Sequence, residues 1–174
     1  MPCLISSGRV RACKDGLGGN STLYLFDNLE NAFTVANGEA ITMDSDLLKA
    51  YKFELEGDGN TLEESMVGDR NTGSRVNTQT LTVNLKSMDA ATSANLNLIT
   101  AGYPQAVIVD RNGNYIALGL DDGIDFTVVA QSGGAKSDMN GYVLTGVSTT
   151  SELAPHLDAT TITQFLAVVE DLTV

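Results

Sequence analysis

Short runs of alternating apolar and polar residues, separated by asparagine and glycine, recur along the chain and constrain its fold more than any other feature. Residues 81–85 alternate leucine and valine with threonine and asparagine, which is the period of a strand with one buried face. Asn37-Gly38 and Asn112-Gly113 each separate two such runs, and this dipeptide is the strongest short signal for a two-residue hairpin. The pattern predicts a mainly β fold.

The predicted secondary structure follows from this pattern and from two helical periods. A short helix is expected over 90–99, because a capping residue precedes it, Ala91, Ala94 and Leu98 share one face, and Gly102 follows. The segments predicted to be strands are 23–26, 33–36, 40–43, 51–55, 61–67, 76–85, 106–109, 115–120, 126–130 and 142–147.

A second helix is expected at the C-terminal end, over 159–172, with Asp158 as its cap. The β-branched run 160–163 opposes a helix, but five apolar residues fall at helical spacing and would form one stripe. That stripe must be covered, either by the subunit's own sheet or by a neighbour's. The stripe consists of Ile162, Phe165, Leu166, Val169 and Leu172.

Length and composition indicate one soluble domain. The chain has 174 residues and a mass of 18.3 kDa, and 43% of its residues are apolar, which suits a single core. We expect one β-rich domain over 1–174, with an N-terminal arm (1–22) and a C-terminal extension (156–174). No secretory signal is predicted, and no apolar run is long enough to span a membrane.

The charge is strongly acidic and unevenly distributed. The net charge is −12, which excludes the usual phosphate-binding surface of clustered Lys and Arg. The first 20 residues hold three basic residues and one acidic residue, for +2; from residue 112 onward one basic residue faces eight acidic ones, for −7. This pattern describes either a solvated acidic surface or a basic arm that docks on a neighbouring copy.

The supply of reactive side chains points away from an enzyme. The chain has one histidine and two cysteines, too few for a His/Cys metal site or a cysteine protease. Glu63 and Glu64 are adjacent, so in a strand they face opposite sides and cannot act as a pair. Cys3 and Cys13 could be free thiols or a disulfide. We therefore predict no catalytic residue, no metal and no cofactor.

One segment has the composition of a calcium loop. Asp110-Arg-Asn-Gly-Asn114 begins like an EF-hand, but Tyr115 occupies the position where that loop needs glycine. Strands rather than helices are predicted on both sides. A hairpin turn is therefore expected here.

The order of predicted elements resembles that of phage tail tube proteins. The resemblance runs through the strand in 51–57, the polar segment to Arg75, the strand 76–85, the helix to Ile99 and the hairpin 107–114. Residues 1–3 with 13–19, and 139–145 with 154–155, also resemble small virion proteins of phage tail gene clusters. The resemblance covers most of residues 1–155, while the segment from Asp158 departs from a minimal tube subunit.

The resemblance implies a β-sandwich or β-barrel of the tail-tube type. Six copies would form a ring, and stacked rings would form a tube that passes DNA without binding it specifically. We expect a virion protein, assembled in the host cytoplasm, whose partners are its own copies and other tail or head–tail proteins, with no membrane. The alternatives are a head–tail ring or adaptor, a capsid-decorating protein, or a non-viral β-sandwich module that binds a sugar or peptide through Tyr103, Tyr115 or Tyr142.

Residues 57–75 are the main predicted contact between copies. This polar, glycine-bearing segment, which includes a possible strand over 61–67, is expected to be mobile in the free subunit and ordered by its neighbours. Deleting residues 60–74 is then expected to spare the fold and abolish self-assembly. The candidate interface residues are Asp69, Arg70, Arg75, Phe165, Val169, Arg9 and Arg11.

Overall fold

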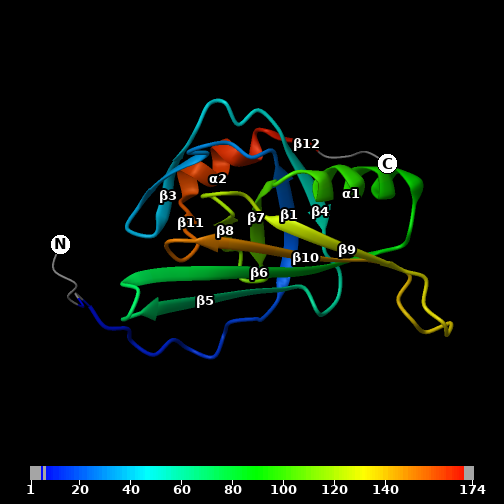
Figure 1. Ribbon diagram of the computed structural model, residues 1–174, viewed down its shortest axis with the longest axis horizontal. Coiled ribbons are helices and arrows are strands. Elements are labelled where there is room, and N and C mark those ends of the chain that lie inside the picture. Colours follow the sequence, from blue (N-terminus) through cyan, green and yellow to red (C-terminus); the bar gives the residue numbers. More distant parts are fainter. Residues whose placement is uncertain (1–4, 6, 171–174) are drawn as a thin grey trace.

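The computed structural model describes residue 5 and residues 7–170, and it confirms the predicted mainly β fold. Strands hold 45% of the chain and helices 12%. The strands form two sheets, one of eight strands and one of four. The four-stranded sheet runs across one face of the larger sheet, so that the strands of the two layers cross in Figure 1.

The element bounds show how the chain is shared between the layers. In spatial order, the eight-stranded sheet consists of β12 (Val169–Glu170), β4 (Ala50–Glu54), β1 (Asn20–Phe26), β7 (Gln105–Asp110), β8 (Tyr115–Leu118), β11 (His156–Leu157), β3 (Glu39–Met43) and β2 (Phe33–Ala36). The four-stranded sheet consists of β5 (Thr61–Asp69), β6 (Ser74–Lys86), β10 (Gly141–Thr150) and β9 (Asp125–Gln131), and the helices are α1 (Ala90–Ala101) and α2 (Ala159–Leu166).

The central strands β1 and β7 of the eight-stranded sheet are buried on both faces, which explains why they are its most apolar strands. Successive residues of a strand point to opposite faces, so Leu23 and Leu25 of β1 enter one core while Tyr24 and Phe26 enter another. β7 follows the same rule and is almost continuously apolar. Such runs are typical of strands that are covered on both sides.

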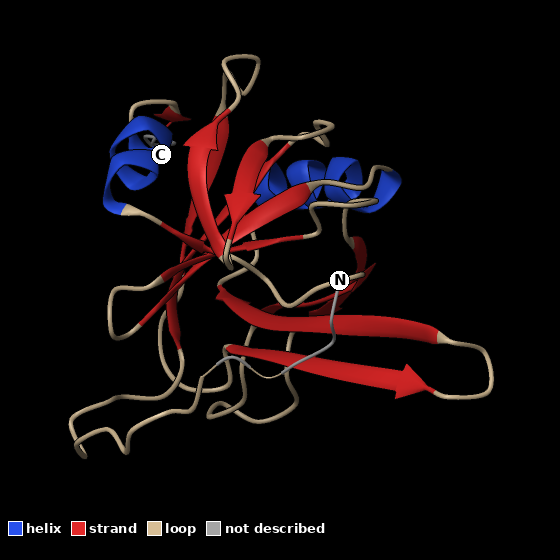
Figure 2. Cartoon of the chain, turned by 90° about the vertical axis from the view of Figure 1, so that its left-hand side faces the viewer, coloured by secondary structure: helices blue, strands red, loops and turns tan. Residues whose placement is uncertain are grey.

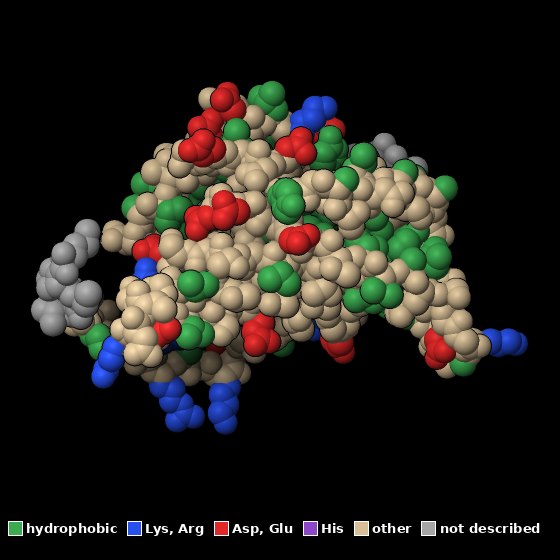
Figure 3. All heavy atoms as spheres, viewed as in Figure 1, with side chains coloured by type: hydrophobic (Ala, Val, Ile, Leu, Met, Phe, Trp, Pro, Cys, Tyr) green, Lys and Arg blue, Asp and Glu red, His purple; other side chains and the backbone are tan. Residues whose placement is uncertain are grey.

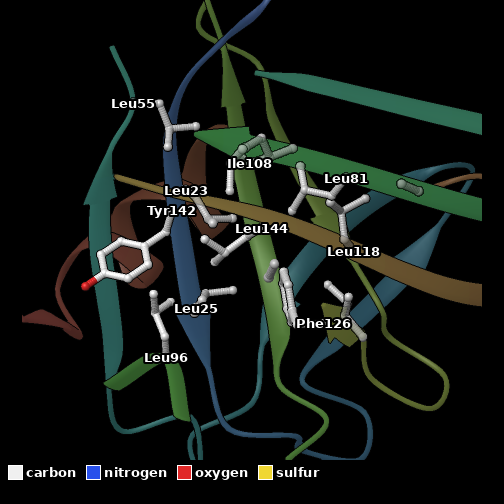
Figure 4. Close-up of a cluster of buried hydrophobic side chains, with 14 residues drawn as sticks. Leu23, Leu25, Leu55, Leu81, Leu96, Ile108, Leu118, Phe126, Tyr142 and Leu144 are labelled. Carbon is white, nitrogen blue, oxygen red and sulfur yellow. The ribbon is translucent and has the colours of Figure 1, made fainter. Parts of the chain in front are cut away.

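The first core lies between the two sheets. Figure 4 shows Leu23 and Leu25 of β1 and Ile108 of β7 meeting Leu81 of β6 and Leu144 of β10. Both β6 and β10 lie in the middle of the four-stranded sheet. This shared core holds the smaller sheet in a fixed position on the larger one.

The second core lies between the curled eight-stranded sheet and α2. Phe165 of α2 is fully buried at its centre, with its ring centroid 5.4 Å from that of Tyr24, 6.0 Å from Phe26 and 6.2 Å from Phe33. Phe33 comes from β2 at one edge of the sheet, while Tyr24 and Phe26 come from β1 near the other edge. The sheet therefore curls around this side chain as a half-barrel.

Both Asn-Gly hairpins and the capped helix starts are confirmed. Asn37 and Gly38 have φ of 54° and 82°, as a type I′ turn between β2 and β3 requires. β7 and β8 pair on either side of the second turn. The Asp89 side chain accepts a hydrogen bond from the Thr92 amide at 2.7 Å, and Asp158 caps α2 in the same way.

The segment predicted to be a mobile loop is instead a long β-hairpin. β5 pairs with β6 in unbroken register from Thr61↔Thr82 to Asp69↔Ser74, and only residues 70–73 form the turn. The predicted strand 61–67 is therefore confirmed but longer, and the loop prediction is wrong. A loop is predicted here because β5 has polar residues on both faces and therefore lacks the alternation of apolar and polar residues that marks a strand. Figure 2 shows the hairpin reaching beyond the rest of the fold.

The predicted apolar face of α1 is also wrong. Leu98 is 72% exposed, and Ala91 and Ala94 are exposed as well, whereas Leu96 is buried. The buried side includes Ser93, because its hydroxyl hydrogen-bonds to the phenol of Tyr142 on β10. The side of α1 that faces the first core carries Leu96 and Ile99 instead of the predicted residues.

The C-terminal segment is integrated into the eight-stranded sheet. β11 pairs with β3 and β8, and β12 pairs with β4. The second predicted helix is present but ends at Leu166, because Val168 accepts a hydrogen bond from the Ala50 amide and Val169 pairs with Ala50. Leu172 lies outside the described residues.

Candidate assembly surface

The four-stranded sheet has two open edges, one along β5 and one along β9. The strand order β5-β6-β10-β9 places these two strands on the outside. Within residues 7–170, no backbone hydrogen bond connects either outer edge to another element. An open edge presents unpaired amide and carbonyl groups, which are a template for pairing with another chain.

The edge strand β9 carries few of the features that prevent pairing. Residues 126–131 contain no charged residue, no proline and no glycine, although edge strands of monomeric proteins are usually interrupted by such residues. Val129 in this strand is 52% exposed. β9 pairs with β10 without a bulge over its whole length. It is therefore suited to accept a further strand.

The solvent-facing side of the four-stranded sheet is rich in threonine. Thr61, Thr82, Thr145 and Thr127 are cross-strand neighbours and form one row across all four strands. Thr78 and Thr80 on β6 and Thr149 on β10 continue the same face on one side of this row, toward the hairpin turn. We call these seven residues the threonine face.

Charges are sparse on the threonine face. Glu63 and Asp125 share it, and Lys86 lies at its end, where its ammonium is 3.7 Å from the Glu56 carboxylate. In Figure 3, Lys and Arg side chains lie at the margins of the visible surface. The face can contact a polyanion by neutral hydroxyls and methyls without the phosphate ion pairs that give tight binding.

A buried polar network fixes the hairpin to the body. The Oε1 atom of Glu64 accepts hydrogen bonds from Asn77 Nδ2 at 2.9 Å, from Gln79 Nε2 at 3.1 Å and from the Ala154 amide at 2.9 Å. Asn77 and Gln79 are buried, and Gln79 Oε1 accepts from the Gly119 amide at 3.0 Å. This network joins β5 and β6 to two segments beneath the sheet. The sequence analysis did not single it out.

Replacing Glu64 with alanine is expected to lower the free energy of unfolding by about 2 kcal/mol, because buried amide donors lose their shared acceptor. Glu63→Ala is the matched control, since Glu63 is adjacent and lies on the opposite, exposed face. It should change stability by less than about 0.5 kcal/mol. Urea unfolding of both variants gives the comparison; equal midpoints would contradict a stabilising network.

Three of the predicted interface residues meet at the far end of the hairpin. Asp69 and Arg75 flank the turn that carries Arg70, and all three are exposed. The Asp69 carboxylate accepts from the Asn71 amide at 2.8 Å and so shapes the turn. Arg75 lies 3.5 Å from Glu152 in an exposed ion pair that contributes little to stability. Both arginine side chains are exposed at this end of the hairpin.

The other predicted interface residues divide into two groups. Arg9 and Arg11 are exposed in the irregular arm before β1. Phe165 is fully buried and Val169 packs against the second core. Both belong to the subunit's own core, so of the two alternatives for the C-terminal stripe, own-sheet packing is found. This corrects their place among the interface candidates.

The residues predicted as alternative sites form no shared site. The Asp110 carboxylate accepts four hydrogen bonds from the amides and side chains of Asn112 and Asn114, as the predicted hairpin turn requires. Partial burial raises the pKa of this carboxyl, but hydrogen bonds from Asn114 and Asn112 outweigh it and hold the pKa below its ordinary value. Its charge is satisfied within the turn.

The three tyrosines proposed for a binding module lie apart. Tyr142 is 3% exposed with its hydroxyl donating to the Asp89 carbonyl, Tyr115 stacks on Tyr24, and Tyr103 is 61% exposed beyond α1. Cys13 is a free, exposed thiol in the arm, and Cys3 lies outside the described residues. Among residues 7–170 no three His, Cys, Asp or Glu side chains are grouped to hold a metal ion.

Known proteins give no guide to the function of this chain, so the open edges and the threonine face are the features from which a function is inferred. The part of the chain described here contains no helix that is long and apolar enough to cross a membrane. No protein-family model, curated protein or solved structure matches the chain.

Proposed function

We propose that this chain is a structural subunit of a virion tail, of the tail-tube type, whose copies join edge to edge into rings. The open edges of the four-stranded sheet carry this proposal. β5 of one copy would pair with β9 of the next. Such a contact uses two different surfaces and therefore generates a ring if the rotation closes.

The strand directions favour this contact. Each neighbouring pair in β5-β6-β10-β9 is antiparallel, so β5 and β9 run in opposite directions. Pairing β5 with a neighbour's β9 continues the antiparallel order through the joint. A ring of such sheets is a closed barrel, and closure removes every exposed edge of that sheet.

The threonine face gives the ring a function. The opposite side of the four-stranded sheet is covered by the eight-stranded sheet, so the threonine face is the side that can line a central channel. A channel wall of threonine hydroxyls with a few acidic groups does not grip a DNA backbone. The proposed role is a conduit in the virion, assembled in the host cytoplasm from copies of this chain with other tail or head–tail proteins.

The hairpin is proposed to connect one ring to the next along the tube. It reaches beyond the body (Figure 2) and carries Arg70 and Arg75 at its end in an otherwise acidic chain. Opposite charge favours contact between this end and the acidic surface of an adjacent ring. The hairpin is therefore the proposed contact along the tube, and the sheet edges are the contact within a ring.

Shortening the hairpin is expected to leave rings but prevent tubes. Residues 60–74 should not be deleted, because Asn60 is buried and its Oδ1 accepts from the Asn84 amide at 2.8 Å. Replacing 67–76 with Asn-Gly instead joins Met66 to Asn77, which are cross-strand partners. The Glu64 network stays intact, so the melting temperature should change little.

Electron microscopy and thermal unfolding test the shortened hairpin. Single rings with a native melting temperature are the expected result. Tubes of normal length would contradict the role given to the hairpin.

A further inference from the structure

An apolar groove lies between α1 and the ends of β1 and β4. Its volume is about 540 Å³, and Leu25, Tyr51, Phe53, Leu98 and Tyr103 contribute to its wall. Leu98 is 72% exposed and Tyr103 is 61% exposed. Large exposed apolar side chains around one hollow indicate a binding surface. Asp27 is the charged residue among the described residues that line it.

The N-terminal arm has the complementary chemistry. Val10 is 90% exposed and stands between Arg9 and Arg11, which are also exposed. The arm is held at its base, where Asn112 Oδ1 accepts from the Leu17 amide at 2.8 Å and Asn112 Nδ2 donates to the Leu17 carbonyl at 2.8 Å. No hydrogen bond joins residues 7–16 to any other described residue.

The arm and the groove lie on opposite sides of the subunit. In Figure 1 the arm leaves along the β5 side of the four-stranded sheet, whereas α1 packs against β9. In the proposed ring, β5 of one copy meets β9 of the next, so the arm of the first faces the α1 side of the second. Ten extended residues span up to about 33 Å, so the arm reaches well beyond its base at Leu17.

We propose that residues 7–16 of each copy dock in the α1 groove of its ring neighbour. Val10 enters the apolar groove beside Leu98 and Tyr103, and Arg9 or Arg11 approaches Asp27. The contact places the basic arm on an acidic neighbour and covers apolar side chains of both partners. This inference rests on the proposed ring, because the ring supplies the neighbour.

A pair of matched leucine substitutions tests the groove. Leu98→Asp places a charge in it, and Leu48→Asp is the control, since Leu48 is 74% exposed and does not line the groove. We expect Leu98→Asp to raise the protein concentration needed for ring formation at least about tenfold, as a loss of about 1.4 kcal/mol per contact requires. Leu48→Asp should assemble normally, and both should keep the native melting temperature.

Disulfide trapping identifies the occupant. Val10→Cys combined with Leu98→Cys, in a chain with Cys3→Ser and Cys13→Ser, should give a ladder of covalent oligomers on mild oxidation. Either single cysteine variant should give at most dimers. A crosslink within one chain would mean that the arm covers its own groove, and a small apolar molecule copurifying in the groove would mean a different ligand; each result overturns the inference.

The outcomes separate this inference from the proposed function. Rings that form normally with Leu98→Asp, and that show no arm-to-groove crosslink, overturn arm docking and leave the ring in place. A wild-type chain that stays monomeric overturns both.

Discussion

Replacing Phe165 with aspartate is expected to unfold the subunit. The side chain is fully buried among the rings of Tyr24, Phe26 and Phe33. Truncating such a phenylalanine costs about 3–5 kcal/mol, and an unpaired buried carboxylate adds to that cost. A typical domain has only about 5–15 kcal/mol of stability, so circular dichroism should show loss of most of the folded protein.

Leu166→Asp is the control for this prediction. Leu166 follows Phe165 in α2 but is 42% exposed, so the same change should lower stability by about 1 kcal/mol. The pair separates burial of the side chain from any general effect on the helix. Native-like unfolding of Phe165→Asp in urea would contradict the position of α2 against the curled sheet.

Replacing Val129 with lysine is expected to abolish ring formation without unfolding the subunit. Val129 lies in the middle of β9 and is 52% exposed, and a lysine on an edge strand opposes pairing with another chain. A loss of about 2–3 kcal/mol at each joint weakens that joint roughly a hundredfold. Light scattering should report monomers, and the melting temperature should stay close to that of the wild type.

An edge strand of the other sheet provides a matched control. Val35 lies in β2 at the end of the eight-stranded sheet and is 41% exposed, so Val35→Lys makes the same change outside the proposed joint. Rings should form normally. Assembly by Val129→Lys, or loss of assembly by both variants, would contradict pairing through β9.

The strands that the sequence predicts well are those with one buried face or with a strong turn signal beside them. Alternation in 76–85 and the Asn-Gly turns identify β6 and two hairpins because burial and turn geometry act on neighbouring residues. β1 and β7 are found for a related reason, since a strand that is covered on both faces is apolar throughout.

The features that the sequence does not predict depend on contacts between distant residues. The predicted strand 61–67 is shorter than β5 and lies in a segment predicted to be mobile, because pairing with β6, rather than the pattern of β5 itself, holds β5 in place. The buried face of α1 is set by Leu96 and Ile99, which pack against core residues from strands distant in the sequence, such as Tyr142. The Glu64 network did leave a signal in the sequence. Asn77 and Gln79 are polar residues at positions of β6 where the alternation predicts buried apolar residues.

Negative-stain electron microscopy of the purified wild-type chain tests the central claim most directly. The four-stranded sheet has two open edges, formed by strands that run in opposite directions, and a threonine-rich face with few charges between them. We predict closed rings of uniform diameter with a central channel, and stacks of these rings at higher protein concentration. Uniform monomers at every concentration, with no rings or tubes, would contradict the proposed assembly.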